Sequence, residues 1–327
     1  MNASKRRILW WAAICLLFLT ALTLRTWNLL DVPPGLTHDE ASNAHDASGV
    51  LAGKHAIYFA SGYGHEPLYV YSVALFTALT GESIWTLRYT SVIWSLLLLA
   101  LTTALSRRWW GRRAAILTAT AITTSFWGQM MGRVGLRAPV LPVLFTASVL
   151  CFDQATYRDR HQVRNFILSG ICLGASFYTY MASRGLPLVF VFFVVVQLVM
   201  NRRLFGRIWR GTLLAITTAL LTGAPLFMHL QRHPELELRV AQLGGALIKF
   251  FKGDPIPLIK NITNSLPLLL WRADPQWLYN SSGRAALEPL FAVFFVGGVA
   301  AALGKIKQPR NVFLLLWVGA GVAPALL

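Results

Sequence analysis

The chain has 327 residues, of which 55% are hydrophobic and only 13% are charged, and its formal net charge is +17. A soluble domain carries about a quarter charged residues, so this composition excludes an ordinary soluble domain and favours a polytopic membrane protein. The charge alone would suit nucleic acid, but the basic residues separate apolar runs instead of alternating with exposed aromatic residues. We therefore expect no nucleic-acid partner.

Nine apolar runs have the length and composition of transmembrane helices, which predicts an all-α membrane protein. In chain order they are Ile8–Leu24, Ile84–Leu105, Ala114–Met131, Val140–Tyr157, Phe166–Tyr180, Leu186–Met200, Gly211–Met228, Leu287–Leu303 and Val312–Leu327. No small-residue cleavage site follows the first run before Arg25, which favours a retained signal-anchor helix over a removed signal peptide.

Five basic clusters lie between these runs and hold more than half of the 30 Lys and Arg residues. They are residues 5–7, 107–113, 158–164, 202–210 and 305–310. Lys and Arg accumulate in the cytoplasmic loops of membrane proteins, and one path through the membrane puts all five clusters on that side. The same path makes residues 25–83 and 229–284 external loops.

One further apolar segment, Pro67–Thr80, is only about 14 residues long, which is too short to span a bilayer. Counting it as a span would break the alternation of the basic clusters. We therefore predict an interfacial or re-entrant helix on the outer leaflet, where Tyr69, Tyr71 and Trp85 would lie at the level of aromatic anchors.

Two adjacent acids, Asp39 and Glu40, follow the first run by about a dozen residues. An acidic pair close to a bilayer is costly to keep, so it indicates chemistry or binding. A carboxylate there can accept a proton from a hydroxyl nucleophile. The alternative is structural, because acids also favour the first turn of a helix, and the Ala-rich segment after Glu40 is a candidate helix.

Other unusual polar residues fall on the same predicted outer side. Those that we expect to bind substrate are His65, Glu66, Arg133, Arg137, Tyr180, Arg184, Asn280 and Arg284. Arginine is suited to phosphate because its fork can bind two oxygens at once. The set therefore indicates a phosphate-linked substrate. The alternatives are that His65 and Glu66 cap the helix beginning near Pro67, and that the arginines anchor span ends at lipid headgroups.

The order and spacing of several short motifs resemble those of GT-C class glycosyltransferases of the PMT-like and Rgt-type bacterial group, which share an ArnT-like fold. The matching segments are Leu24-Arg25, Asn28-Leu29, Pro33-Pro34-Gly35-Leu36, Asp39-Glu40, Glu66-Pro67-Leu68, Leu87-Arg88, Gly132-Arg133, Leu136-Arg137, Tyr178-Thr179-Tyr180, Arg184, Asp274-Pro275, Asn280, Gly283-Arg284 and Glu288-Pro289. The resemblance covers nearly the whole chain.

The resemblance implies a single transmembrane domain over residues 1–327, incomplete at its C-terminal end because members of the group are longer. It implies inverting transfer of a sugar from a polyprenyl-phosphate donor to a lipid, glycan or protein acceptor, with Asp39 as the catalytic residue beside Glu40. Some relatives have a second acid where this chain has Arg137 and Ala138, so a two-acid mechanism gains no support here. The resemblance leaves a divalent metal, Mg or Mn, open.

Two other function classes remain beside this one: a polytopic transporter of lipid or oligosaccharide, and a membrane subunit without catalysis. A transporter should carry polar residues at the middle of broken helices, whereas the acids here lie near span ends. For the enzyme we expect a multi-pass protein of the plasma or inner membrane.

Overall fold

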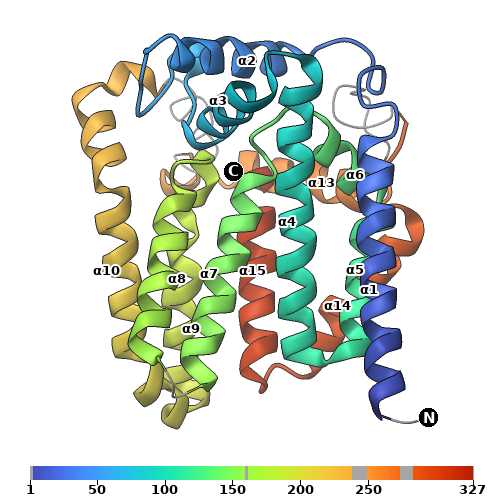
Figure 1. Cartoon of the computed structure of the whole chain (residues 1–327). Helices are drawn as coiled ribbons and strands as arrows, with labels where there is room; N and C mark the ends of the chain where they lie inside the picture. Colours follow the sequence, from blue (N-terminus) through green and yellow to red (C-terminus); the bar gives the residue numbers. More distant parts are fainter. Residues whose placement is uncertain (1–2, 159–160, 238–248, 273–282, 327) are drawn as a thin grey trace. The chain divides into compact units, whose positions relative to one another are not determined.

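The computed structural model describes residues 3–158, 161–237, 249–272 and 283–326, and these are almost entirely helical. An isolated β-bridge pairs Phe59 with His65. The first helices are α1 (Ala3–Thr26), α2 (His38–Leu51), α3 (Leu68–Thr80), α4 (Ile84–Trp110), α5 (Arg112–Thr124), α6 (Phe126–Arg133) and α7 (Val140–Tyr157) (Figure 1). The later ones are α8 (Gln162–Ser176), α9 (Pro187–Met200), α10 (Arg202–Arg232), α13 (Ile256–Leu270), α14 (Pro289–Gly304) and α15 (Pro309–Leu326).

Three short 3-10 turns accompany these helices, namely η1 (Ser61–Tyr63), η2 (Met181–Gly185) and η3 (Pro234–Leu236). The chain forms two compact units. The first unit contains residues 1–56 and 67–150, and the second contains residues 57–66 and 151–327. The boundary falls inside α7, so this helix contributes to both units.

Five helical stretches in the described residues are long and apolar enough to cross a membrane. They are Ser4–Thr26, Ile84–Trp110, Val140–Tyr157, Met181–Met200 and Arg202–Arg232. Leu68–Thr80, Pro289–Gly304 and Pro309–Ala323 are shorter apolar helices. The predicted class, an all-α polytopic membrane protein, is confirmed, and α3 has the short length expected of an interfacial helix. Its position at the outer leaflet stays a prediction.

The predicted single span Ala114–Met131 is two helices, because the chain breaks between α5 and α6 at Ser125. The Ser125 hydroxyl accepts a hydrogen bond from the Gly128 amide at 3.3 Å, which is the usual N-cap geometry. The carbonyls left unpaired at the end of α5 are met by side chains. Arg25 donates to Ile122 O at 3.2 Å, and Gln129 donates to Thr123 O.

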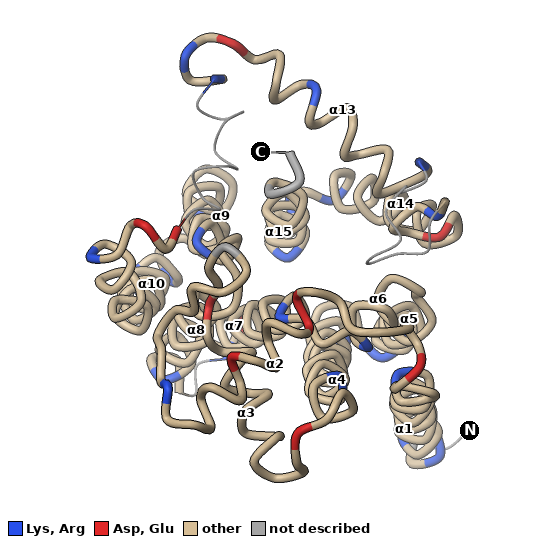
Figure 2. The backbone as a smooth tube through the Cα atoms, turned by 90° about the horizontal axis from the view of Figure 1, so that it is seen from above, with Lys and Arg blue, Asp and Glu red and all other residues tan. Residues whose placement is uncertain are grey.

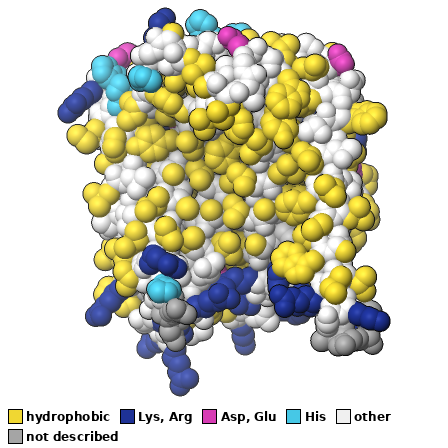
Figure 3. Space-filling model, viewed as in Figure 1, with side chains coloured by type: hydrophobic (Ala, Val, Ile, Leu, Met, Phe, Trp, Pro, Cys, Tyr) yellow, Lys and Arg dark blue, Asp and Glu magenta, His cyan; other side chains and the backbone are white. Residues whose placement is uncertain are grey.

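In the first unit, α1, α4, α5 and α6 pack around one another (Figure 2), and α3 packs on both α2 and α4. The two N-terminal basic clusters meet at one end of these helices. The Arg107 guanidinium lies 4.4 Å from the centre of the Trp10 ring, and Trp10 Nε1 donates to Arg112 O at 3.2 Å. Over α1 and α4 in Figure 3, hydrophobic side chains cover the middle of the helices and basic ones gather at this end.

In the second unit, Arg310 at the start of α15 pairs with Asp153 near the end of α7, at 4.0 Å. The buried carboxylate of Asp153 thereby has a basic partner from the fifth cluster. The Arg310 guanidinium also lies 5.1 Å from the centre of the Tyr157 ring. The fifth basic cluster therefore lies beside the C-terminal end of α7. Which side of the membrane the basic ends face stays a prediction.

The most extensive helix packing in the second unit joins α8 to α10. A Cβ placed on Gly174 would lie 2.6 Å from the backbone oxygen of Ala219 and 2.6 Å from Cβ of Thr222. Small residues at such positions allow membrane helices to approach closely. Because the obstacle at Gly174 includes backbone, a side chain there cannot be accommodated by rotation of a neighbour.

We predict that Gly174→Ala destabilises the protein by about 1–3 kcal/mol, the usual cost of an overpacked site. Gly298→Ala in α14 is the matched control, since a Cβ there would meet nothing within 4 Å. Unfolding of both variants in the same detergent would be followed by circular dichroism. Equal midpoints for the two variants would show that α8 and α10 are not packed as described.

Candidate functional site

The acidic pair lies in the first turn of α2. The Thr37 hydroxyl accepts a hydrogen bond from the Glu40 amide at 3.2 Å, and the Glu40 carboxylate accepts one from the Thr37 amide at 3.0 Å. This reciprocal capping box follows from the sequence Thr37-His38-Asp39-Glu40, which has the spacing that the motif requires. The helix-start interpretation of the pair is therefore confirmed, and for Glu40 the contacts go further than capping.

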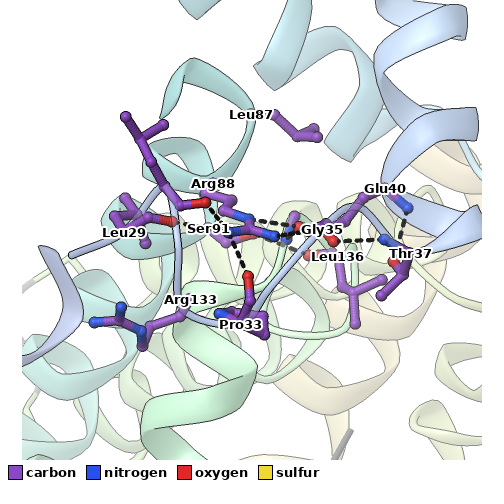
Figure 4. Close-up of polar contacts among 12 residues, drawn as sticks. Leu29, Pro33, Gly35, Thr37, Glu40, Leu87, Arg88, Ser91, Arg133 and Leu136 are labelled. Carbon is purple, nitrogen blue, oxygen red and sulfur yellow. Dashed lines mark hydrogen bonds and ion pairs between the residues drawn. The ribbon is translucent and has the colours of Figure 1, made fainter. Parts of the chain in front are cut away.

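Glu40 is fully buried and forms an ion pair with Arg88, which is also fully buried. Arg88 Nε donates to Glu40 Oε1 at 3.0 Å, and the amide of Gly135 donates to the same oxygen at 2.9 Å. Glu40 Oε2 receives the Thr37 amide. A buried charge needs such partners on every side, because an unpaired one is severely destabilising. Figure 4 shows Arg88 and Glu40 at the centre of this group of contacts.

The remaining nitrogens of Arg88 bind the backbone of the loop between α1 and α2, residues 27–37. Nη1 donates to the carbonyl oxygens of Leu29, Leu30 and Pro33 at 2.9, 3.2 and 2.9 Å. Nη2 donates to the carbonyl of Gly35. One guanidinium thus binds both the loop and the acid that follows it.

Arg133 holds the same loop through other carbonyls. Its Nη1 donates to Leu24 O at 2.6 Å, and its Nη2 donates to Trp27 O at 2.7 Å and Val32 O at 2.8 Å. Burial, followed by the positive charge of Arg88, lowers the pKa of the Arg133 guanidinium. The expected phosphate contact of Arg133 stays a prediction, and these hydrogen bonds weigh against it because all three nitrogens donate to backbone.

Asp39 is placed differently from its neighbour. Its side chain is 54% exposed, with His38 Nδ1 at 4.0 Å from Oδ1. Successive residues on a helix point about 100° apart, so a buried Glu40 leaves Asp39 turned away from the core. Of the two predicted catalytic acids, Asp39 is therefore the one that a substrate can reach.

Arg137 belongs to the turn that Glu40 binds. Asn43 Nδ2 donates to Gly135 O at 2.9 Å, and Ser91 Oγ donates to Leu136 O at 3.3 Å. A Cβ on Gly135 would come within 2.6 Å of Leu87 Cγ, so the turn approaches α4 as only glycine allows. Arg137 itself is half-buried, two residues beyond this anchor.

The other predicted site residues belong to the second unit. His65 is buried, with its Nε2 3.1 Å from Ser61 Oγ, and Glu66 is buried beside it. Arg184 Nη2 lies 2.5 Å from Glu237 Oε1, and both side chains are about one quarter exposed. Tyr180 is half-buried and immediately precedes η2. These residues are described within their own unit, and their convergence with Arg137 stays a prediction.

Two predicted site residues remain. Arg284 Nη2 binds Glu288 Oε1 at 3.1 Å, just before α14 begins. Asn280 lies outside the described residues. For the metal that the sequence left open, the described residues bring together no group of three His, Cys, Asp or Glu side chains. Both carboxylate oxygens of Glu40 are engaged by Arg88, Gly135 and Thr37.

Sequence reasoning did not select Arg88 as a site residue. The signal was present, because an arginine within an apolar helix is expensive unless it is paired and marks a functional region by default. The sequence did not identify the partner of Arg88, because Glu40 lies 48 positions earlier in the chain.

We predict that Arg88→Met destabilises the protein by about 3–5 kcal/mol, the usual cost of leaving one buried charge without its partner. The double variant Arg88→Met with Glu40→Gln should cost less than the two single changes added together. It leaves no buried charge without a partner, whereas each single variant does. Arg113→Met, at an exposed position, is the control. Additive effects in denaturant unfolding would show that the two side chains are not coupled.

Comparison with known proteins places the chain in a family. The family model described as dolichyl-phosphate-mannose-protein mannosyltransferase matches residues 64–229, just over half of the chain. No curated protein matches the sequence at a significant level.

Several solved structures share the fold. ArnT from Cupriavidus metallidurans bound to undecaprenyl phosphate matches 99% of this chain and 60% of its own, with 15% identity and a TM-score of 0.57. The apo structure of ArnT matches 100% of this chain and 60% of its own, with 16% identity and a TM-score of 0.56. AglB, the oligosaccharyltransferase from Archaeoglobus fulgidus in complex with an inhibitory peptide and a dolichol-phosphate, matches 98% and 48%, with 12% identity and a TM-score of 0.61.

The chain spans about 60% of ArnT and about half of AglB. At these identities the structural matches establish the fold, and the family match establishes the relationship. The chain has the PMT-like GT-C fold that its motifs predict, and it belongs to the dolichyl-phosphate-mannose-protein mannosyltransferase family.

Proposed function

We propose that this protein is an inverting membrane glycosyltransferase that moves a sugar from a polyprenyl-phosphate carrier to an acceptor hydroxyl on a lipid, glycan or protein. The observation that carries the proposal is the shared anchor at Glu40. One buried carboxylate fixes the first turn of α2, which bears the half-exposed Asp39, and the turn that bears Arg137. A proton acceptor and a phosphate-binding cation are thereby held by the same group.

In this proposal Asp39 takes the proton of the acceptor hydroxyl as the hydroxyl oxygen attacks the anomeric carbon. The bond from that carbon to the phosphate oxygen breaks, and the carrier phosphate leaves with the bonding electron pair. General-base assistance of this kind contributes roughly 10²–10⁴-fold. Glu40 is not assigned proton transfer, because both of its oxygens already accept hydrogen bonds in the core; it positions Asp39.

Negative charge develops on the departing phosphate, so cations aimed at it stabilise the transition state. Arg137 is the candidate in the first unit. Arg184 is the candidate in the second, where its Nη2 lies 2.5 Å from a carboxylate oxygen of Glu237, which is also an anionic group. An arginine fork binds two oxygens of either group.

A lipid-linked donor fits the predicted topology. Nucleotide sugars are cytosolic, and the predicted path puts the loop before α2 on the opposite side from the basic ends. The ArnT structure holds undecaprenyl phosphate and the AglB complex holds a dolichol-phosphate, which supports a carrier of the same class here. We place the protein in the plasma or inner membrane.

We predict that Asp39→Asn lowers the rate of sugar transfer by about 10²–10⁴-fold, since the amide keeps the size of the side chain but cannot accept the proton. Asp46→Asn, on the same helix, is the matched control and should keep its rate. The measurement is transfer from a polyprenyl-phosphate sugar in proteoliposomes. A wild-type rate in Asp39→Asn would remove Asp39 from catalysis, whereas no transfer by the unchanged protein would leave the transporter and the non-catalytic subunit as the remaining functions.

We also predict that alanine at Arg137 or Arg184 weakens donor use by about 10- to 150-fold. This follows from the loss of one charge-assisted bond, roughly 1.5–3 kcal/mol. Lysine should restore only part of the loss, because it lacks the two-pronged geometry. Donor titrations of Ala and Lys variants separate this role from headgroup anchoring, where lysine would restore function fully. An unchanged donor KM in both Ala variants would contradict the phosphate site.

A further inference from the structure

The loop between α1 and α2 presents apolar side chains to its surroundings and turns its carbonyls inward. Its exposed hydrophobic side chains are Trp27, Leu30, Val32 and Leu36, which are 75%, 54%, 45% and 44% exposed. The carbonyls held by guanidinium groups are those of Trp27, Asn28, Leu29, Leu30, Val32, Pro33 and Gly35. Most of the irregular backbone therefore needs no water to satisfy its acceptors.

This arrangement matches what a lipid environment demands. Irregular backbone does not occur exposed to lipid unless its polar groups are satisfied within the protein, since each unsatisfied group costs several kcal/mol. Loops in water face no such demand, because solvent satisfies them. Two buried arginines donate hydrogen bonds to the carbonyls of this one exposed loop. This arrangement therefore indicates that the loop is surrounded by lipid and not by water.

The position of the loop supports the same conclusion. It continues directly from the candidate span Ser4–Thr26, which itself exposes Leu16, Leu19 and Leu24. Trp27 stands at the end of that span, where tryptophan is enriched in membrane proteins. Asp31 is exposed within the loop. Because a carboxylate is not accommodated in hydrocarbon, the loop would lie at the headgroup boundary.

We propose that residues 27–36 insert into the headgroup boundary of the outer leaflet and anchor the first unit to the lipid surface. The partner is the phospholipid bilayer itself. The sequence predicts that residues 25–83 form an external loop. The proposal adds that residues 27–36 of this loop lie among the lipid headgroups. The anchor also fixes the height of Asp39, because the capping box at Thr37 joins the loop to α2. That last consequence rests on the proposed function, whereas the anchoring does not.

The depth of Leu30 tests the proposal. Cys15, Cys151 and Cys172 are replaced by alanine, a spin label is attached to Leu30→Cys, and the protein is reconstituted into phosphatidylcholine–phosphatidylglycerol vesicles without polyprenyl lipid. His45→Cys, exposed on α2, is the matched aqueous control. We expect the label at Leu30 to be relaxed more by oxygen than by water-soluble nickel chelate, and the label at His45 to show the reverse order. Nickel-dominated relaxation at Leu30 would overturn the anchor.

A second measurement avoids removal of the native cysteines. A photo-crosslinking benzoylphenylalanine replaces Leu30 or His45 in the otherwise unchanged chain, and the products are identified by mass spectrometry. We expect phospholipid adducts at Leu30 and not at His45. Adducts at Leu30 to protein alone would show that a second copy or another segment covers the loop, and would overturn the proposal. Because neither measurement uses sugar transfer, failure of the anchor is distinguishable from failure of the proposed enzyme.

Discussion

The ion pair between Glu40 and Arg88 is the constraint on which the first unit depends. Taking both charges out of water is costly, and it is tolerated only because the remaining hydrogen-bonding groups of both side chains find partners. Those partners are backbone groups of three separate segments, so satisfying the charges also fixes the loop, the start of α2 and the turn at Gly135. The geometry around Asp39 and Arg137 is a consequence of that electrostatic requirement.

The choice of arginine at positions 88 and 133 follows from the same requirement. A lysine offers three donors from one atom, whereas a guanidinium offers five from a rigid plane and can reach carbonyls on several sides. Both arginines bind one short loop, and the charge of Arg88 contributes to the lowered pKa of Arg133. The carbonyls offset this repulsion because they present the negative ends of many peptide dipoles to the two cations.

Sequence reasoning was strongest where the physics is local. Apolar runs predicted the helices, and two adjacent acids before an Ala-rich segment offered a helix start as one alternative. It was weakest where partners lie far apart in the chain. Nothing local marks Gly135 as the partner of Glu40 or Leu24 as the partner of Arg133. The break at Ser125 was missed because apolar residues continue on both sides of it. The local signals were the Ser125 hydroxyl, which can cap a helix, and the two threonines that precede it.

The two neighbouring acids show why a motif cannot be divided into roles before the fold is known. Each was a candidate for catalysis, and each was a candidate for capping. Helical geometry forces adjacent side chains onto different faces, so once one acid is needed in the core the other is left outside. Burial then removes Glu40 from chemistry by giving its oxygens to Arg88, Gly135 and Thr37. The same contacts fix the helical turn that carries Asp39. The structural role of Glu40 is therefore the physical basis for the catalytic role proposed for Asp39.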